Sequence, residues 1–576
     1  MAGNGGSGTG DMTSFGLWAI GILAGVAVLL TCAAEVAAVV FGGHHWLPFS
    51  PIDAVKAAAH WRAPALGWPA AVRSDVPGMV PYWVTTVVVL VGVLVAALLL
   101  YLRVAGHRAG FGAHPVRSEL RSMGHRATRQ QAKRLRPAGV ESEHDHVRDH
   151  GLLLGKVVGS GQEIYASWED SLLVIGPPRS GKTTSLVIPM VVEAPGAVVT
   201  TSTRPDVWQA VHGLRGKVGP VLVFDPSGLA PAAEQLRWSP IQGCEDPRVA
   251  LRRARAMTSA VGKGGVQGAD FWVGAAADVL AGVLHAAALA GAEPSRLLGW
   301  VGSPSTLEVP AQILDEDPRT APGWAARLAG VANNPATQTV GSILATLGQA
   351  LTPLAHPAVL AACSPGPDEG FDAEQIIKER ATICLLATPG GSNPAPLLSA
   401  LIVDLTETAR GIASASPGGR LDPPLLLMLD EAANIAPLPD LGTWLAATGG
   451  DGVVTALILQ SLEQARGRWG NDAAGAMLDA ATIKLVLPGL AQPQDLASLA
   501  QLAGESYEDE TSRTSGTGGT STTVGRRLRP VLRPDQLRGL PAGHAMLIPR
   551  RLAPAELVLV PEWDRPWGSK RSRRHR

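Results

Sequence analysis

The sequence predicts an α/β protein in which a largely parallel sheet carries a phosphate-binding loop, an all-α domain is inserted into the sheet region, and two transmembrane helices come first. Three observations predict this fold. A glycine-rich loop at 176–183 directly follows a short apolar run, a second apolar run at 425–430 leads into two adjacent acidic residues, and two long apolar stretches precede both.

The composition places few limits on the partners of the protein. The chain has 576 residues, 46 % of them hydrophobic, and a formal net charge of zero. This length is enough for roughly two to four folding units, and a neutral chain has no overall attraction for nucleic acid. Its 4 cysteines have neither disulfide nor metal-ligand spacing, which favours a reducing compartment for the soluble part.

The two apolar stretches, 15–41 and about 80–104, form a predicted membrane anchor at 15–104. Each is long enough to cross a hydrocarbon core of about 30 Å as a helix. Basic residues are sparse in the loop between them and frequent after the second stretch: Arg103, Arg108, Arg117, Arg121, Arg126, Arg129, Lys133, Arg134 and Arg136. Because positively charged loops stay inside, residues 1–14 and everything after the second span are predicted to lie in the cytoplasm.

Two basic segments have more than one interpretation. The segment 105–150 is predicted to be a juxtamembrane linker that binds anionic membrane lipid, with nucleic-acid binding as the alternative. The tail at 566–576 is consistent with contact to phosphate backbones or lipid and with an unstructured solubilising end. Glu35 lies inside the first span, where a carboxylate is costly unless it is neutral, snorkels to the interface or is paired.

The loop at 176–183 matches the pattern G-x-x-x-x-G-K-[ST], and it stands between a strand-like run and a helix-like run at 184–192. In this pattern the glycines allow the chain to wrap phosphates, while backbone N–H groups and a helix N-terminus attract the negative charge. Lys182 is predicted to reach the β- and γ-phosphates of ATP, and Thr183 to bind Mg²⁺. The predicted nucleotide-binding residues are Gly176, Pro177, Pro178, Arg179, Ser180, Gly181, Lys182, Thr183 and Thr184.

The second apolar run leads into Asp430 and Glu431. Asp430 is predicted to hold the Mg²⁺ shell, and Glu431 to orient and deprotonate the attacking water. The second acid therefore favours hydrolysis over transfer to a substrate. A third run, 453–459, ends in Gln460, which is predicted to report the γ-phosphate, with a polar residue that merely ends a strand as the alternative. The predicted catalytic residues are Lys182, Glu431 and Gln460.

Further strand-like runs alternate with helical or loop stretches, which is the rhythm of a largely parallel sheet covered by helices. These runs lie at 197–201, 221–224, 382–386, 482–487 and 545–548. The nucleotide-binding domain is predicted to occupy 151–261 and 366–565.

The segment between these two halves, 262–365, has apolar residues at helical spacing and is predicted to be an all-α insert. Phe271 and Trp272 open one of its helices and are expected in its core, with stacking on a base as the alternative. A Ser-, Thr- and Gly-rich stretch at 505–525 is predicted to be a flexible surface loop.

Together these motifs resemble the conjugative coupling proteins of type IV secretion, the TraG/TraD type. The resemblance rests on the loop Ile175–Thr184 behind a two-span anchor, on Leu429-Asp-Glu-Ala432 and on Leu459-Gln-Ser461, and it covers about residues 150–565. Further landmarks follow in the same order as in the family: Arg215, Val221–Pro226, Trp238–Pro240, Asp270–Trp272, Pro437–Pro439, Gln464, Trp469–Gly470 and Leu532–Leu537.

By this resemblance, the protein is expected to be a hexameric RecA-like ATPase at the inner face of the cell membrane. The expected cofactors are ATP and Mg²⁺. The expected partners are single-stranded DNA with its relaxase or protein substrates, components of a type IV secretion channel, and other copies of the chain. The insert at 262–365 is then the candidate for cargo recognition.

Two other functions remain open from the sequence. One is a duplex-DNA pump of the FtsK or HerA type, which the cargo-domain-like insert and the lack of an obvious C-terminal winged-helix module in the sequence argue against. The other is a membrane docking receptor whose nucleotide only gates assembly, which Glu431 argues against because a receptor of that kind needs no catalytic base.

Overall fold

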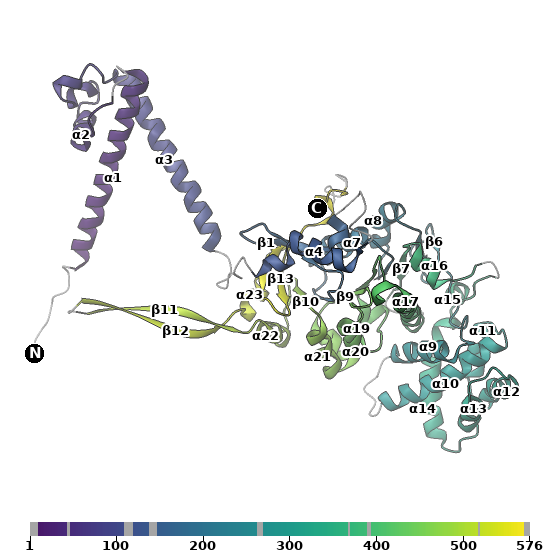
Figure 1. Cartoon of the computed structure of the whole chain (residues 1–576). Coiled ribbons are helices and arrows are strands. Elements are labelled where there is room, and N and C mark those ends of the chain that lie inside the picture. The colour runs from purple at the N-terminus through teal and green to yellow at the C-terminus, as the bar shows by residue number, and fades with distance from the viewer. Residues whose placement is uncertain are drawn as a thin grey trace, which may run out of the picture. The chain divides into compact units, whose positions relative to one another are not determined.

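The computed structural model describes residues 10–42, 46–108, 119–137, 147–261, 269–366, 369–388, 393–516 and 519–568. The chain divides into two compact units, Met1–Gly110 and Phe111–Arg576 (Figure 1).

The first unit is built on two long helices, α1 (Gly10–Phe41) and α3 (Met79–Arg108). Between them lie a short helix and two 3-10 turns: α2 (Pro51–Ala59), η1 (Pro64–Gly67) and η2 (Ala70–Val72). Small residues of α1 and α2 pack around the buried rings of Trp68 and Tyr82.

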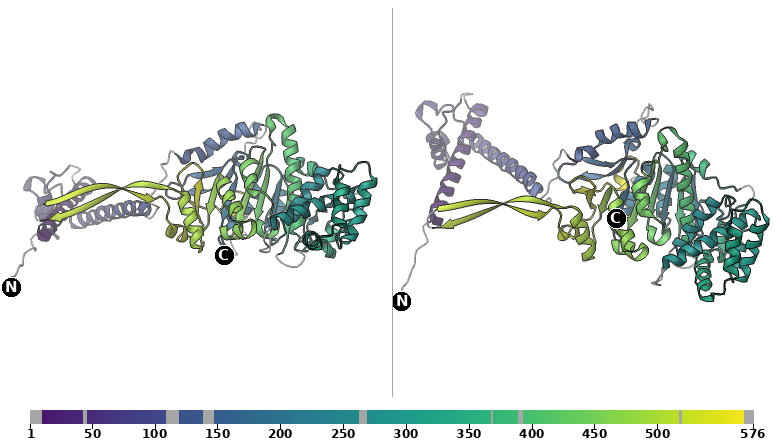
Figure 2. Two further views of the ribbon diagram at one scale, coloured as in Figure 1. Left: turned by 90° about the horizontal axis from the view of Figure 1, so that it is seen from below. Right: turned by 60° about the horizontal axis from the view of Figure 1, so that its bottom comes forward.

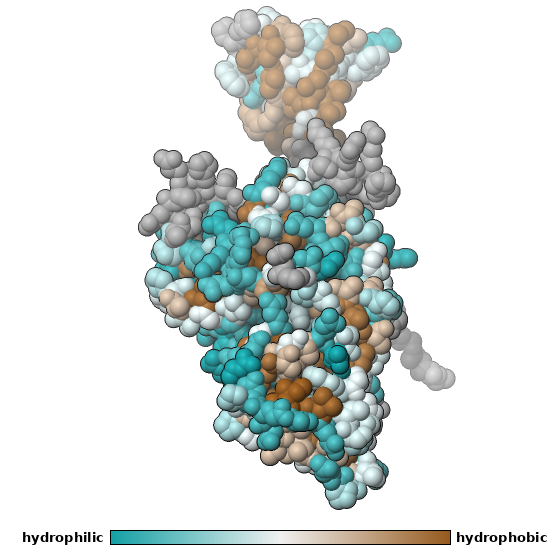
Figure 3. Space-filling view, turned by 90° about the vertical axis from the view of Figure 1, so that its right-hand side faces the viewer, coloured by the Kyte–Doolittle hydropathy of each residue, from teal (hydrophilic) through white to brown (hydrophobic). Residues whose placement is uncertain are grey.

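Where their side chains are described, α1 and α3 expose large apolar residues such as Val40, Val88 and Leu94, which is the reverse of a helix in a soluble protein. Over Met79–Ala96, α3 is long and apolar enough to cross a bilayer, and only 11 % of this window is buried. The part of α1 whose side chains are described, Gly25–Phe41, is apolar but shorter. Figure 3 shows brown, apolar surface gathered over the first unit and mainly teal surface over the second. The two apolar helices expected ahead of the predicted nucleotide-binding domain are therefore present.

The second unit is built on a 12-stranded sheet with the order β2-β1-β14-β13-β10-β3-β9-β8-β4-β7-β5-β6. The strands from β10 to β6 are parallel, and β13, β14, β1 and β2 continue the sheet in antiparallel pairs. The bounds are β1 (Leu152–Val157), β2 (Glu163–Ala166), β3 (Leu172–Ile175), β4 (Val198–Ser202), β5 (Val221–Phe224), β6 (Glu234–Gln235), β7 (Thr382–Leu386), β8 (Leu425–Asp430), β9 (Val453–Leu459), β10 (Ile483–Val486), β13 (His544–Pro549) and β14 (Ala555–Val558).

Helices cover both faces of this sheet (Figure 2). Around the sheet lie η3 (Leu120–Met123), α4 (His125–Leu135), α6 (Val147–His150), η4 (Thr183–Val187), α7 (Ile188–Glu193), α8 (Asp206–Arg215), α9 (Pro247–Ser259), α16 (Ala373–Lys378), α17 (Ala395–Ala415), η7 (Pro417–Gly419), α18 (Ala432–Ile435), α19 (Leu441–Ala447), α20 (Leu462–Trp469), α21 (Asn471–Ala480), α22 (Pro493–Leu502), α23 (Pro534–Arg538) and η8 (Glu562–Asp564).

Alternate residues of the central strands enter two separate cores because successive side chains of a strand point to opposite faces. In β3, Leu173 and Ile175 join the core on the side of α17, whereas Leu172 and Val174 join the core that contains α7 and α8. Both faces being buried explains why these strands read as continuous apolar runs.

The helical insert follows α9 and consists of α10 (Ala269–Leu289), α11 (Ser295–Trp300), η5 (Ser305–Leu307), α12 (Glu308–Glu316), α13 (Trp324–Ala332), α14 (Thr337–Leu351), η6 (Thr352–Ala355) and α15 (Pro357–Ala362). Its central helix α10 is apolar enough to resemble a membrane span over Phe271–Leu289, but 61 % of that window is buried inside the protein, in part against α9. Phe271 is 66 % exposed, and Trp272 is half-buried against the core. The expectation that both rings are buried is therefore met only in part, because Phe271 starts the helix outside its packed face.

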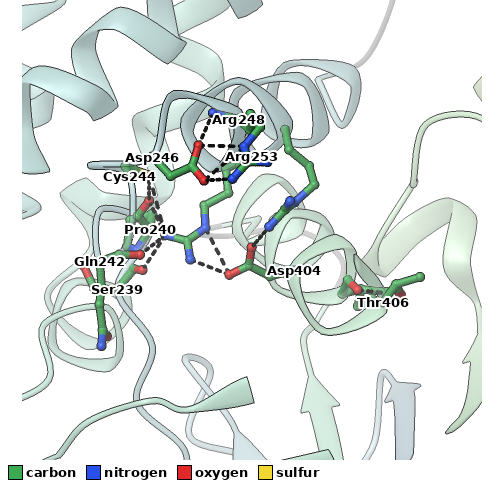
Figure 4. Close-up of polar contacts among 11 residues, drawn as sticks. Ser239, Pro240, Gln242, Cys244, Asp246, Arg248, Arg253, Asp404 and Thr406 are labelled. Carbon is green, nitrogen blue, oxygen red and sulfur yellow. Dashed lines mark hydrogen bonds and ion pairs between the residues drawn. The ribbon is translucent and has the colours of Figure 1, made fainter. Parts of the chain in front are cut away.

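A buried ion-pair network joins α9 to the sheet region (Figure 4). The guanidinium of Arg253 donates to the carboxylate of Asp404 on α17, with 3.1 Å from Nε to Oδ2, and to the carbonyl oxygens of Pro240 and Gln242 at 3.0 and 2.5 Å. Arg252 donates to the other carboxylate oxygen at 3.0 Å. Arg253 and Asp404 are both buried, and because each is the partner of the other, neither charge is buried alone.

Two segments differ from the sequence prediction. The stretch at 505–525 is not a loop: β11 (Glu505–Gly516) and β12 (Gly519–Pro530) pair in register as a separate two-stranded sheet (Figure 1). Its threonines and Val524 favour strands, which outweighs the glycines used for the loop prediction. The predicted linker at 105–150 contains α4, which packs on the sheet region. The described part of the predicted tail at 566–576 ends at residue 568.

Candidate nucleotide-binding site

The predicted site residues converge at the carboxyl ends of three adjacent strands. Strand β9 lies between β3 and β8, and all three are parallel. The loop of Lys182 follows β3, Asp430 ends β8, and Gln460 follows β9. Carboxyl ends of parallel strands are where α/β proteins bind ligands, because the following loops meet there.

The loop after β3 is shaped by two residues in the left-handed region, Arg179 with φ 65° and Gly181 with φ 85°. Turns of this kind present successive backbone N–H groups on one side and so form anion-binding nests. Space around Gly176 is tight, since a Cβ there would stand 2.6 Å from Leu487 Cδ1 and 2.8 Å from Ser180 Oγ and would force these side chains to move. The loop therefore has the backbone of a phosphate cradle.

The helix after the loop begins with a π-helical turn, η4, in which Ile188 N–H donates to the carbonyl of Thr183. Pro189 follows and lacks the N–H that a regular α-helix would use at this point. The sequence predicted a helix over 184–192, and the structure has η4 and then α7 there. Thr183 and Thr184 open this element beside Lys182.

Lys182 lies close to two acidic side chains, Asp430 at the end of β8 and Glu431 directly after it. Its Nζ is 3.7 Å from Asp430 Oδ1 and 3.9 Å from Glu431 Oε1. Lys182 and Asp430 are 7 % and 5 % exposed. Burial raises the pKa of Asp430 to about 6, and the charge of Glu431 raises it too, whereas Lys182 acts in the opposite direction. The site thus holds Lys182 and Asp430 away from bulk water, whereas Glu431 is partly exposed.

Glu431 is the first residue beyond β8 and has φ 53°, a conformation that is strained for a residue with a side chain. Its carboxylate accepts a hydrogen bond from Gln460 Nε2 at 3.4 Å. Gln460 itself is held by its backbone N–H, which donates to Gln464 Oε1 at 3.0 Å. The structure therefore brings Lys182, Asp430, Glu431 and Gln460 into one cluster.

Two buried polar atoms of the site have no hydrogen-bond partner among the described residues: Ser180 Oγ in the loop and Asp430 Oδ1 at the end of β8. Such atoms are rare in folded proteins and call for an explanation such as a bound ion or ligand. Both belong to residues that the sequence analysis assigns to the nucleotide and metal site.

The sequence analysis missed Thr201. Its Oγ1 in β4 donates to the backbone carbonyl of Asp430 at 2.6 Å and so fixes the end of β8. A fully buried hydroxyl inside an apolar strand is the signal that could have found it, because it must have a partner.

Comparison with known proteins agrees with this geometry. The sequence profile of the type IV secretory system conjugative DNA transfer family matches residues 122–558. The chain belongs to this family. No curated protein sequence matches the chain.

Solved structures of the bacterial conjugative coupling protein TrwB are similar to this chain. The trigonal form of TrwBdeltaN70 in complex with sulphate has a TM-score of 0.53 at 16 % identity, covering 80 % of this chain and 98 % of that one. TrwB with the non-hydrolysable ATP analogue ADPNP has a TM-score of 0.52 at 17 % identity, with coverages of 70 % and 88 %. TrwB with ADP and Mg²⁺ has 0.50 at 17 %, with 74 % and 91 %. At these identities the likeness shows the fold, and it confirms the RecA-like core with a helical domain.

Proposed function

We propose that this member of the conjugative DNA transfer family is a membrane-anchored ATPase coupling protein. It brings single-stranded DNA with its relaxase, protein substrates or both to a type IV secretion channel and drives their transfer by ATP hydrolysis. The observation that carries the proposal is the convergence of Lys182, Asp430 and Glu431 at the carboxyl ends of β3 and β8.

The site fits ATP with Mg²⁺. A phosphate chain needs N–H donors and a cation, which the loop and Lys182 supply, and Mg²⁺ prefers oxygen ligands such as the Thr183 hydroxyl and the Asp430 carboxylate. Ser180 Oγ and Asp430 Oδ1, which have no hydrogen-bond partner among the described residues, support this assignment. TrwB, which has the same fold, was solved with an ATP analogue and with ADP and Mg²⁺. Bound ATP would supply the phosphoanhydride bond whose hydrolysis drives the cycle.

The charged side chains of the site have different proposed roles. Without nucleotide, Lys182 balances Asp430 and Glu431. With ATP and Mg²⁺ bound, the ammonium of Lys182 would neutralise phosphate oxygens, and the Asp430 carboxylate would help to hold the Mg²⁺. Glu431 is then the base that orients and deprotonates the attacking water, and Gln460, hydrogen-bonded to it, senses whether the terminal phosphate is present.

The assembly proposed around this site is a ring of six chains, with both termini and the ATPase domain in the cytoplasm. Its pore grips the phosphate backbone of a single strand, so binding weakens steeply with salt and depends little on base sequence. The helices α10–α15 recognise cargo. Membership of the conjugative DNA transfer family and the name of TrwB, a plasmid coupling protein, support this part.

A conjugation assay tests the proposal. Donor cells whose own copy is deleted receive wild-type chain, Lys182→Ala or Glu431→Gln, with protein levels in the membrane fraction measured in parallel. Transfer should be lost with both variants at normal protein levels. Full transfer by Glu431→Gln would instead identify a docking receptor that needs nucleotide binding without hydrolysis.

A further inference from the structure

Helix α4 has two faces of opposite character. Thr128 and Ala132 are 2 % and 1 % exposed, and Leu135 packs on the core that also contains β3 and α7. The opposite arc of α4, His125–Leu135, is exposed and carries its arginines and its lysine. The sequence of α4 contains no acidic residue that would offset this charge. An amphipathic helix with a basic outer face is typical of a contact with an anionic surface.

Three basic residues of the outer face have no ion-pair partner among the residues that the structure describes. Arg126, Lys133 and Arg134 are exposed and form no ion pair with any of the described residues. Arg126 and Lys133 are seven residues apart, which is about 10 Å along one side of an α-helix. These three side chains therefore form one continuous basic face.

The helix is held firmly against the sheet region by a buried arginine at its end. Arg136 is 4 % exposed, and it donates from Nε to Asp422 Oδ1 at 3.0 Å and from Nη1 to Asp149 Oδ1 at 3.0 Å. Asp422 lies three residues before β8, the strand that ends in Asp430. A surface fixed in this way is part of the ATPase body and not a loose linker.

The position in the sequence indicates what covers this face. Helix α3, whose outer surface is apolar, ends at Arg108, and α4 begins at His125. A basic cluster that closely follows a membrane span is attracted to the anionic lipids of the cytoplasmic leaflet. Single-stranded nucleic acid is the weaker fit, because its sites add aromatic side chains for stacking and the exposed arc of α4 has none.

We propose that the basic face of α4, formed by Arg126, Lys133 and Arg134, docks on anionic lipid headgroups and fixes the orientation of the ATPase body at the membrane. Each of these residues strengthens docking about fivefold, so removing all three weakens it roughly a hundredfold. Docking is screened by salt, since the Debye length falls to about 3 Å at 1 M.

A spin label on α4 of the full chain tests the proposal. Gln130 is exposed within the basic face, and Cys32 is the exposed native cysteine among the described residues. The label is placed by Gln130→Cys in a Cys32→Ser background, and the chain is reconstituted into nanodiscs of phosphatidylcholine alone or with phosphatidylglycerol. The readout is the collision rate of the label with a water-soluble nickel reagent, which needs no ATP turnover. Anionic lipid should lower this rate severalfold, and 1 M salt should restore it.

The variant Arg126→Gln/Lys133→Gln/Arg134→Gln should remove the effect of anionic lipid. A matched control with the same loss of charge, Arg237→Gln/Arg248→Gln/Arg319→Gln, should keep it, because these exposed arginines lie outside α4. Equal collision rates in both lipid compositions would overturn the proposal. So would protection that appears only when single-stranded DNA is added, which would make the face a nucleic-acid surface.

Discussion

Replacement of Glu431 by Gln separates nucleotide binding from hydrolysis in this site. The amide keeps the size of the side chain and an oxygen for Gln460 Nε2, now 3.4 Å away, and Lys182 keeps Asp430 at 3.7 Å. What the substitution removes is the proton acceptor. General-base catalysis contributes about 10²–10⁴-fold, so kcat should fall by that factor, or about 3–5 kcal/mol in activation free energy.

The assay is steady-state ATP turnover by the full chain in nanodiscs, together with the Kd of a fluorescent ATP analogue. ATP affinity of Glu431→Gln should stay within a fewfold of wild type. Glu463→Gln is the matched control, because that carboxylate is 57 % exposed on α20 and pairs with Arg466 at 3.0 Å, away from Lys182 and Asp430; its turnover should not change. A kcat within tenfold of wild type, or a parallel loss of affinity, would refute the assignment of Glu431 as the base.

Three further predictions follow from buried charges. Arg253→Ala leaves Asp404 buried with Arg252 as its remaining partner, so the free energy of unfolding in urea should fall by at least about 3 kcal/mol. A fall below about 1 kcal/mol would contradict the buried network. In the nucleotide-free protein the pKa of Asp430 is raised from 3.8 to about 6 by burial, so this group's contribution to stability is complete below about pH 3.8 and is lost as the pH rises through about 6. Asp430→Asn should therefore raise the free energy of unfolding at pH 8 by up to about 3 kcal/mol, seen as a higher melting temperature, and should change the melting temperature little at pH 4. An equal effect at both pH values would contradict the raised pKa. Lys182→Ala should weaken ATP binding at least about tenfold, because a charge-assisted contact worth about 1.5–3 kcal/mol is lost, and unchanged binding in equilibrium dialysis would contradict its placement.

The central strands could be predicted from the sequence because both of their faces are buried. A strand such as β8 is apolar at every position until Asp430, so its boundary is visible. The same holds for β3 and β9, and the site residues that follow these three strands could be named for that reason. Their convergence follows from the parallel order of the strands, which the motif spacing implied.

The edge of the sheet could not be predicted in the same way. Strands β1, β2 and β14 form antiparallel pairs and contain exposed or half-buried positions, so their apolar pattern is weaker. The Ser-, Thr- and Gly-rich composition of β11 and β12 predicted a loop. The two strands nevertheless pair, because antiparallel pairing is made by hydrogen bonds between backbone N–H and C=O groups, which every residue except proline has. The contact of Arg136 with Asp422 joins residues far apart in the sequence and has no local signal. Thr201 is marked only as a hydroxyl inside an apolar strand, which indicates a partner without naming Asp430.

The helical insert of the second unit could be predicted from the sequence, but its packing on the sheet region could not. Helical spacing predicted an all-α insert at 262–365, and α10–α15 lie in that range. The preceding helix α9 packs on both α10 and α17, and one continuous hydrophobic core includes residues of the insert and of the sheet. A boundary drawn from composition cannot show such a shared core, so the insert and the sheet region are best tested as one folding unit.

The most direct test of the proposed motor is ATP turnover by the full chain in nanodiscs, measured without DNA, with single-stranded DNA and with duplex DNA of the same length, beside Lys182→Ala. The proposed function predicts that single-stranded DNA stimulates turnover more than duplex does and that the substitution abolishes turnover. Turnover that is indifferent to DNA, or that responds to duplex alone, would contradict a motor that transfers a single strand.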